Sequence, residues 1–179
     1  MWAVVLGATA LVIALAIVKG RSGVAGLEGK PAPPVVLTFL EGGKQVPLAE
    51  QRGKVVMLDF WATWCEPCKQ SMPAVQRIWR DYRSRGVDLI AVNTDEPTGR
   101  RDPAIREFLQ RHGLELTVAV DGDRRAAQSA FGVASYPTLV VLDRTGRVSF
   151  THVGVLGGAA ERELRRMLEG ALAGGAPTN

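Results

Sequence analysis

The sequence is poor in two residue types that often carry structure or chemistry, with 2 cysteines and 2 histidines among 179 residues. Cys65 and Cys68 lie so close together that a bridge between them would constrain little of the unfolded chain, which excludes a disulfide scaffold. A structural zinc site normally has four nitrogen or sulfur ligands, and only His112 and His152 are available to complete one. These histidines are far apart in the sequence and have no ligand spacing. We therefore expect no metal site.

The sequence also lacks a basic stripe, internal repeats and long low-complexity tracts. Its formal net charge is +4, but the arginines are scattered and mostly have acidic neighbours. Because nucleic-acid binding usually needs clustered basic residues, we expect no nucleic-acid partner. With 46% hydrophobic and 22% charged residues, the composition is that of a globular protein. The length favours one folded domain with extensions, since a second core would be cramped.

A long uncharged segment opens the chain. Residues 2–18 carry no charge and would span about 26 Å as a helix, which is just enough to cross a bilayer. Lys19 and Arg21 follow directly, where a cleaved signal peptide would need small residues. We therefore predict that residues 1–19 form a single-pass membrane anchor, with a cleaved signal peptide as the alternative. The basic residues after the segment favour a cytoplasmic C-terminal domain, so the orientation must be argued from the chemistry.

The rest of the chain has the pattern of one α/β domain between two irregular segments. Residues 20–33 are rich in glycine and proline, which predicts a flexible linker, and residues 173–179 are predicted to be a disordered tail. Within residues 34–172, short apolar runs alternate with amphipathic segments. We expect strands at residues 35–40, 44–48, 55–60, 87–92, 116–120, 138–142 and 148–153, and helices at residues 67–83, 105–112, 125–131 and 161–172. This order implies a mixed central sheet with helices on both faces.

The two cysteines lie where the first of these helices begins. Pro67 suits a first helical turn, because the N–H that it lacks is not needed there. Cys65 would then sit at a helix N-terminus, where unpaired amides and the helix dipole favour the thiolate that attacks disulfides. Cys68 lies one turn further in and can attack the resulting mixed disulfide. The apolar strand before the motif contains one charged residue, Asp59, which is either a desolvated carboxyl or turned to solvent.

The segment DFWATWCEPCK, residues 59–69, resembles the active-site signature of the thioredoxin superfamily. With the opening hairpin and an insertion near residues 95–113, the chain resembles the membrane-tethered ResA/TlpA-like branch, which includes the cytochrome c maturation type. The resemblance covers residues 33–172 and implies a thioredoxin-like fold. It also implies a thiol-disulfide oxidoreductase that needs no cofactor beyond a redox-active disulfide between Cys65 and Cys68.

The resemblance further implies roles for individual residues. Asp59 matches the buried carboxylate of cytoplasmic thioredoxins, unlike many tethered relatives, and would accept the proton of Cys68. Pro137 matches a cis-proline that faces the cysteine pair. The residues expected to border the substrate are Trp64, Glu66, Pro67 and Tyr136. The charge of Glu66 would oppose stabilisation of the Cys65 thiolate, which goes with a more reducing pair.

We expect the protein to reduce disulfides in client proteins, such as apocytochrome c during cytochrome c maturation, and to be recharged by a membrane dithiol carrier. Its catalytic domain would lie on the periplasmic side of a bacterial cytoplasmic membrane, where oxidants form disulfides. Two alternatives stay open: a peroxiredoxin-like peroxidase and a copper-handling assembly factor. The peroxidase pattern has a threonine three residues before its cysteine, whereas Thr63 lies two before Cys65. Copper handling would need a wider cysteine spacing and a nearby histidine.

Overall fold

The computed structural model describes residues 23–122 and 125–174. The predicted membrane anchor at residues 1–19 and most of the predicted tail lie outside this part of the chain. Among the residues that are described, no helix has both the length and the apolar character needed to cross a membrane.

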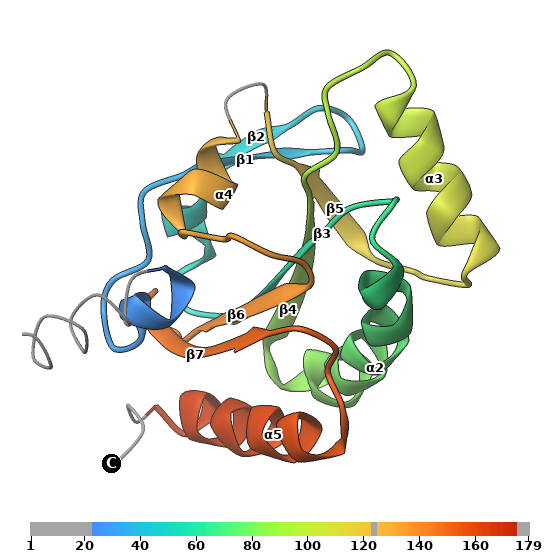
Figure 1. The fold of residues 1–179 in the computed structure, drawn as a ribbon. Helices are drawn as coiled ribbons and strands as arrows, with labels where there is room; N and C mark the ends of the chain where they lie inside the picture. Colours follow the sequence, from blue (N-terminus) through green and yellow to red (C-terminus); the bar gives the residue numbers. More distant parts are fainter. Residues whose placement is uncertain (1–22, 123–124, 175–179) are drawn as a thin grey trace, which may run out of the picture.

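A seven-stranded mixed sheet forms the centre of the fold, in the order β2-β1-β5-β4-β3-β6-β7 (Figure 1). The strands are β1 (Val36–Phe39), β2 (Gln45–Pro47), β3 (Val55–Trp61), β4 (Val87–Asn93), β5 (Thr117–Val120), β6 (Thr138–Leu142) and β7 (Val148–Val153). β3 pairs in parallel with β4 and antiparallel with β6, so the sheet is mixed, as predicted. Every residue of β3 is buried, as expected of a central strand covered on both faces.

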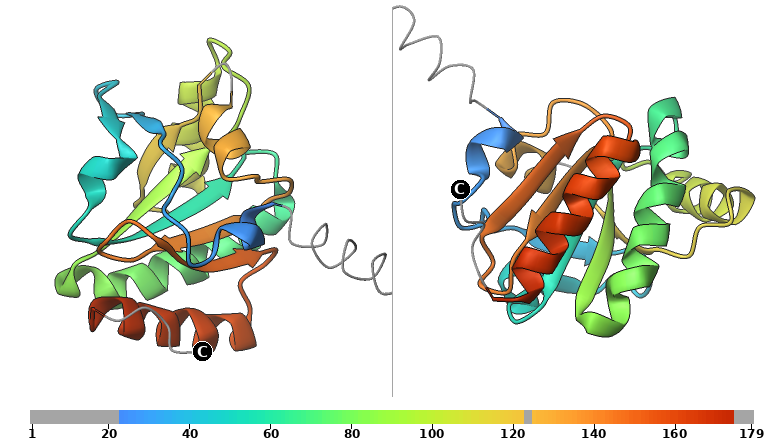
Figure 2. Two further views of the ribbon diagram at one scale, coloured as in Figure 1. Left: turned by 90° about the vertical axis from the view of Figure 1, so that its left-hand side faces the viewer. Right: turned by 90° about the horizontal axis from the view of Figure 1, so that it is seen from below.

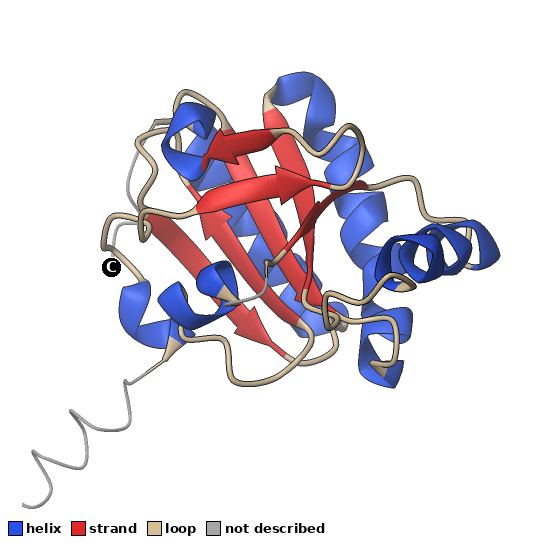
Figure 3. Cartoon of the chain, turned by 90° about the horizontal axis from the view of Figure 1, so that it is seen from above, coloured by secondary structure: helices blue, strands red, loops and turns tan. Residues whose placement is uncertain are grey.

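Helices cover both faces of the sheet, which confirms the predicted layering (Figure 3). The α-helices are α2 (Glu66–Tyr82), α3 (Arg101–Arg111), α4 (Ala126–Ala130) and α5 (Gly158–Leu172), and the 3-10 helices are η1 (Val24–Leu27), η2 (Leu48–Gln51) and η3 (Arg83–Arg85). The two long helices α2 and α5 lie side by side on one face (Figure 2), whereas α4 and η1 pack on the other.

The two faces of β3 belong to separate cores. Met57 packs under α2 and α5, whereas Leu58 and Phe60 pack on the α4 side. This division follows from the alternation of side chains along a strand. A third cluster joins Trp61 at the end of β3 to Phe108 of α3 and to both cysteines. The insertion that carries α3 is therefore packed beside the cysteine pair.

The segment predicted as a flexible linker, residues 20–33, is docked on β7 where it is described. The Gly29 amide donates to the Val148 carbonyl oxygen over 2.8 Å. The Glu28 carboxylate accepts hydrogen bonds from the main chain and the hydroxyl of Thr151, at 2.9 and 2.6 Å. Composition could not reveal this docking, because it depends largely on main-chain groups that every residue carries. The folded domain therefore begins before residue 34.

Two helices begin earlier than periodicity predicted. α3 starts at Arg101 rather than residue 105, and α5 starts at Gly158 rather than residue 161. The first turn of α3 contains Asp102 and Pro103, which suit a helix N-terminus because the acid complements the dipole and the proline needs no partner for an N–H. These first turns have no clear apolar stripe, so the search for helical periodicity missed them.

Candidate active site

Cys65 and Cys68 form a disulfide at the N-terminus of α2. Cys65 is the N-cap residue, and its sulfur accepts a hydrogen bond from the Cys68 N–H over 3.2 Å. Pro67 lies in the first turn, as expected, where its missing N–H leaves no donor unpaired. Cys65 is 4% exposed and Cys68 is fully buried, so Cys65 is the more accessible of the two.

The loop before β6 meets the cysteine motif from the neighbouring strand. The Tyr136–Pro137 peptide bond is cis, as expected for this position. Thr138 then pairs with Phe60, so the cis bond lies beside the end of the strand that leads to the cysteines. Tyr136 packs against the cysteine cluster, and its ring lies edge-on to Trp64 with 5.9 Å between the ring centroids. The expected neighbours of the disulfide are therefore brought together.

Asp59 is buried inside the central strand. It is 1% exposed, and neither of its carboxylate oxygens has a hydrogen-bond partner within the protein. Burial raises the pKa of Asp59 from 3.8 to about 7. The alternative in which Asp59 turns to solvent is wrong. A carboxyl with this pKa can take up and release a proton near neutral pH.

Trp61, two positions after Asp59, has a similarly unpaired polar atom. Its side chain is fully buried, and its indole N–H has no acceptor within the protein. Because residues two apart on a strand share a face, Trp61 and Asp59 point to the same side of the sheet. The Trp61 ring packs on Phe108 of α3, with 4.8 Å between the ring centroids. Trp61 thus forms a wall of the cluster that holds the cysteines.

Glu66 and Lys69 form an ion pair on the exposed side of the first turn of α2. Their charged groups are 2.6 Å apart, and the Glu66 side chain is 68% exposed. The ammonium group of Lys69 offsets part of the negative charge that Glu66 places near Cys65.

His112 adjoins the cysteine cluster through Phe108, whereas His152 lies on β7. His112 packs its ring against Phe108, and His152 stacks over Phe150 on β7. No group of three or more histidine, cysteine, aspartate or glutamate side chains that could hold a metal occurs in residues 23–122 and 125–174.

The residues that hold the loop before Cys65 were not predicted from the sequence. The Thr63 N–H donates to both carboxylate oxygens of Asp95, at 3.1 and 3.3 Å. The Thr94 main chain and hydroxyl both donate to the Trp61 carbonyl oxygen, at 2.9 and 3.1 Å. Thr94 and Asp95 follow directly after β4, the parallel neighbour of β3. Polar residues at the carboxyl end of a buried parallel strand were the available signal.

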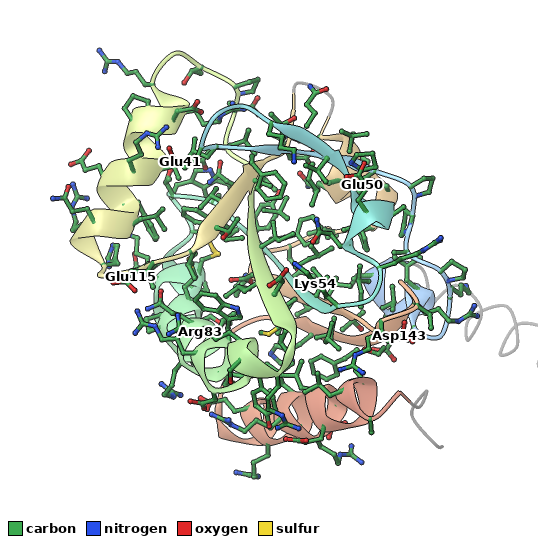
Figure 4. All side chains as sticks on the ribbon, turned by 180° about the vertical axis from the view of Figure 1, so that it is seen from behind. Glu41, Glu50, Lys54, Arg83, Glu115 and Asp143 are labelled. Atoms are coloured by element: carbon green, nitrogen blue, oxygen red, sulfur yellow. A yellow bond between two sulfur atoms is a disulfide. The ribbon has the colours of Figure 1, made fainter. Side chains whose placement is uncertain are left out.

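A surface hollow of about 780 Å³ lies among residues of the β1–β2 hairpin, β5 and the end of α3. Its lining includes four charged residues that are labelled in Figure 4, namely Glu41, Glu50, Lys54 and Glu115. No residue of the cysteine motif lines this hollow. The disulfide and its surroundings are therefore the stronger candidate for the active site.

Comparisons with known proteins support this choice. The Redoxin family profile matches residues 27–168. Thiol-disulfide oxidoreductase ResA of Bacillus thuringiensis (strain Al Hakam) is 38% identical over 120 residues, which cover 67% of this chain and 66% of that protein. The match thus spans just under two thirds of that relative. ResA of Geobacillus thermodenitrificans (strain NG80-2) is 33% identical over 141 residues, covering 79% of this chain and 76% of that protein.

Solved structures have the same fold. The crystal structure of a proposed thiol:disulfide interchange protein DsbE from Chlorobium tepidum matches with a TM-score of 0.70 and 34% identity, over 81% of this chain and 97% of that one. The solution structure of a proposed protein disulfide isomerase from Bacteroides thetaiotaomicron matches with a TM-score of 0.69 and 28% identity, over 82% of this chain and 90% of that one. The chain therefore belongs to the redoxin family of the thioredoxin superfamily, and ResA-like thiol-disulfide oxidoreductases are among its homologues.

Proposed function

We propose that the protein is an extracytoplasmic thiol-disulfide oxidoreductase that reduces disulfides in client proteins such as apocytochrome c. The observation that carries this proposal is the Cys65–Cys68 disulfide at the start of α2, beside the cis peptide bond before Pro137. The 38% identity to a ResA thiol-disulfide oxidoreductase supports the same reaction class.

The reaction proceeds in two exchange steps. In the reduced protein, the Cys65 thiolate attacks one sulfur of the client disulfide, and the second client sulfur leaves as a thiolate. The Cys68 thiolate then attacks the sulfur of Cys65, which closes the Cys65–Cys68 disulfide and releases the first client sulfur. Two electrons pass from the cysteine pair to the client, and the client thiolates take up protons from the solvent and the site.

Asp59 handles the proton of the second step. Cys68 is fully buried, so its thiol needs a nearby acceptor before it can attack. The pKa of Asp59, raised by burial to about 7, suits a group that accepts this proton through water and returns it when the pair is reduced again.

The client binds over the surface around the disulfide. Trp64 is 69% exposed, and Val155 in the loop after β7 is 43% exposed, which provides apolar contacts for a client chain. Main-chain groups before Pro137, beside Tyr136, pair with an extended client segment. Glu66 and Pro67 border the same opening from the first turn of α2.

Residues 1–19 anchor the domain in the bacterial cytoplasmic membrane, and residues 34–172 lie within the part that faces the periplasm. The uncharged run of residues 2–18 supports the anchor, and the need for a reductant where oxidants form disulfides supports the orientation. A membrane dithiol carrier restores the reduced cysteine pair after each turnover.

The proposal is tested with an oxidised peptide that carries the C-x-x-C-H haem-attachment sequence of c-type cytochromes. Reduced parent protein should convert the peptide to its dithiol and acquire one Cys65–Cys68 disulfide per peptide, as measured by mass spectrometry after alkylation. The Cys65→Ser variant is the control and should reduce none. A parent protein that leaves the peptide oxidised but reacts readily with hydrogen peroxide would contradict the proposal and favour a peroxidase.

A further inference from the structure

We infer that Asp95 is a positioning residue for Cys65, because its carboxylate fixes the loop that places the attacking sulfur at the start of α2. This inference rests on the proposed exchange reaction, in which Cys65 is the attacking group. Asp95 itself touches neither cysteine in the contacts described above, and it acts through the main chain of Thr63.

Asp95 is itself held in place by hydrogen bonds to Asn93. Its Oδ2 accepts a hydrogen bond from the Asn93 amide nitrogen over 3.2 Å. The Asp95 N–H in turn donates to Asn93 Oδ1 over 3.1 Å, so the two residues are joined by a pair of hydrogen bonds. Asn93 is fully buried at the end of β4. A carboxylate fixed in this way can set the position of the Thr63 N–H.

Residues 93–95 form what we call the β4 clamp. Trp61 and Asn93 are the last paired residues of β3 and β4, so the two parallel strands end together. Thr94 then bonds to the carbonyl of Trp61, and Asp95 bonds to the amide of Thr63. The clamp therefore holds the chain at the last residue of β3 and again two residues later.

The clamped loop leads directly to the attacking cysteine. The Cys65 N–H donates to the Ala62 carbonyl oxygen over 3.1 Å, which closes a turn with Thr63 inside it. A displacement of Thr63 is therefore transmitted to the N-cap position of α2. Exchange is sensitive to such shifts, because the attacking sulfur must approach the client disulfide in the correct direction.

The charge of Asp95 acts separately from its hydrogen bonds. A negative charge beside the loop disfavours the Cys65 thiolate, which makes the cysteine pair more reducing. Glu66 and Lys69 pair with each other at the same helix start, and Asp59 is buried behind it. Because asparagine retains an oxygen acceptor without the charge, the positional and electrostatic effects can be separated.

Three variants of the full chain test the inference. Asp95→Ala removes both accepting oxygens and the charge, whereas Asp95→Asn removes the charge and one accepting oxygen and keeps the other. Asp143→Ala is the matched control, because Asp143 also caps a loop, accepting the N–H groups of Thr145 and Arg147 at 2.8 and 3.0 Å. Asp143 directly follows β6, whereas Pro137 directly precedes it, so the two residues lie at opposite ends of this strand. Asp143 is labelled in Figure 4.

The measurements are the alkylation of Cys65 by iodoacetamide as a function of pH and the rate of exchange with oxidised glutathione. Asp95→Ala should slow exchange about tenfold, the ratio expected when one hydrogen bond to a charged group is lost from a reactive geometry. Asp95→Asn should keep the rate within about threefold of the parent. Its Cys65 should titrate at lower pH, and its reduction potential should be less negative. Asp143→Ala should match the parent in both measurements.

Parent-like exchange in Asp95→Ala, or equal slowing in both Asp95 variants, would overturn the inference. If Asp95→Ala does not fold, exchange slowed about tenfold in Asp95→Asn, which retains an acceptor for the Thr63 N–H, would overturn it instead. This test is independent of the proposed function, because iodoacetamide reacts with Cys65 without any client. A parent protein that fails to reduce the haem-attachment peptide would contradict the proposed function, while the alkylation results would still decide the role of Asp95.

Discussion

At the scale of single residues, Asp59 is the most unusual member of the core. A buried carboxyl without hydrogen-bond partners is costly, so it would not be expected in a strand that serves packing alone. The sequence identified Asp59 because it is the one charged residue in an otherwise apolar strand. Its burial could not be decided from the sequence, because a residue near a strand end can also turn to solvent.

The first prediction concerns the pH dependence that Asp59 gives to the stability of the oxidised protein. The pKa of Asp59 is raised from 3.8 to about 7 in the folded state, so the folded protein keeps this proton where the unfolded chain has lost it. The parent should therefore lose stability relative to Asp59→Asn as the pH rises from about 4 to about 7, by roughly 4 kcal/mol in total. Above about pH 7 the difference should stay constant.

Urea unfolding of the two oxidised proteins between pH 4 and pH 8 measures this difference, and the disulfide keeps both cysteines from titrating. Titrations of groups other than Asp59 cancel in the comparison. Parallel stability curves for parent and variant would contradict the raised pKa. The same variant should slow exchange near neutral pH in the reduced protein, and a parent-like pH profile of the rate would remove Asp59 from the proposed mechanism.

At the scale of secondary-structure elements, α5 aligns the redox helix α2 through a ladder of ion pairs. The rungs are Arg77–Glu161 at 3.0 Å, Asp81–Arg165 at 2.6 Å and Arg85–Glu169 at 2.7 Å. Each rung is four residues after the previous one on both sides, with Arg85 in η3 directly after α2, so α2 and α5 run parallel in a fixed register. The Tyr82 ring interacts with the guanidinium groups of Arg85 and Arg165, at 5.2 and 5.9 Å from its centroid. The ladder therefore favours one placement of the helix that begins at Cys65.

The second prediction concerns the last rung of this ladder. The hydrogen bond from Arg85, followed by that from the Tyr82 hydroxyl, lowers the pKa of Glu169 from 4.5 to about 2. The stability that this carboxylate adds to the folded state should therefore be fully present at pH values above its ordinary pKa. It should be lost as the pH falls toward 2. In Arg85→Gln the pKa of Glu169 should rise toward 4.5, as followed by NMR titration of its side-chain carboxyl.

Arg77→Gln is the matched control, because it removes the first rung and leaves the Arg85–Glu169 contact in place. The pKa of Glu169 should remain low in this variant. A Glu169 pKa that is insensitive to Arg85→Gln would show that the rung does not persist in solution.

The elements that the sequence predicted well are those with a strong local pattern. β3 and β6 are continuous apolar runs, and α2 has apolar residues at helical spacing. What was missed depends on contacts between distant residues. The Glu28–Thr151 contact joins residues 123 positions apart, and the Thr63–Asp95 contact joins residues 32 apart. No local pattern encodes such pairs, so the partners of the docked segment and of the β4 clamp became visible only in the folded chain.

At the scale of the whole molecule, strand order brings the parts of the site together. The cysteine motif follows β3, the β4 clamp follows its parallel neighbour, and Pro137 precedes its antiparallel neighbour β6. These three segments therefore meet at the same end of three neighbouring strands. Periodicity predicts strands but not their order, so the meeting of Pro137 with the cysteines could be expected only from the family resemblance.

The third prediction concerns the orientation of the molecule in the cell. If the catalytic domain lies outside the cytoplasm, a membrane-impermeant thiol reagent should label Cys65 in intact cells after mild reduction. A cytoplasmic protein with an accessible thiol is the control and should be labelled only after lysis. Protection of Cys65 until lysis would contradict the proposed topology, whatever the reaction that the domain performs.

In the proposed reaction, the two cysteines at the start of α2 perform different exchange steps. Cys65 is the more accessible and is the cysteine that we propose attacks the client, whereas Cys68 is fully buried and would resolve the bond that forms. In Cys68→Ser the first step should proceed and the second should fail, so mixed disulfides with clients should accumulate. In Cys65→Ser the remaining thiol is shielded, and no comparable adducts should form.

Non-reducing gels of the two variants, expressed in the native host, test this claim most directly. We expect client bands linked to Cys68→Ser that disappear on treatment with reductant, and none of similar intensity for Cys65→Ser. Equal trapping by both variants, or trapping by Cys65→Ser alone, would contradict the assigned roles. The absence of adducts from both would contradict the exchange reaction itself and favour the copper-handling alternative.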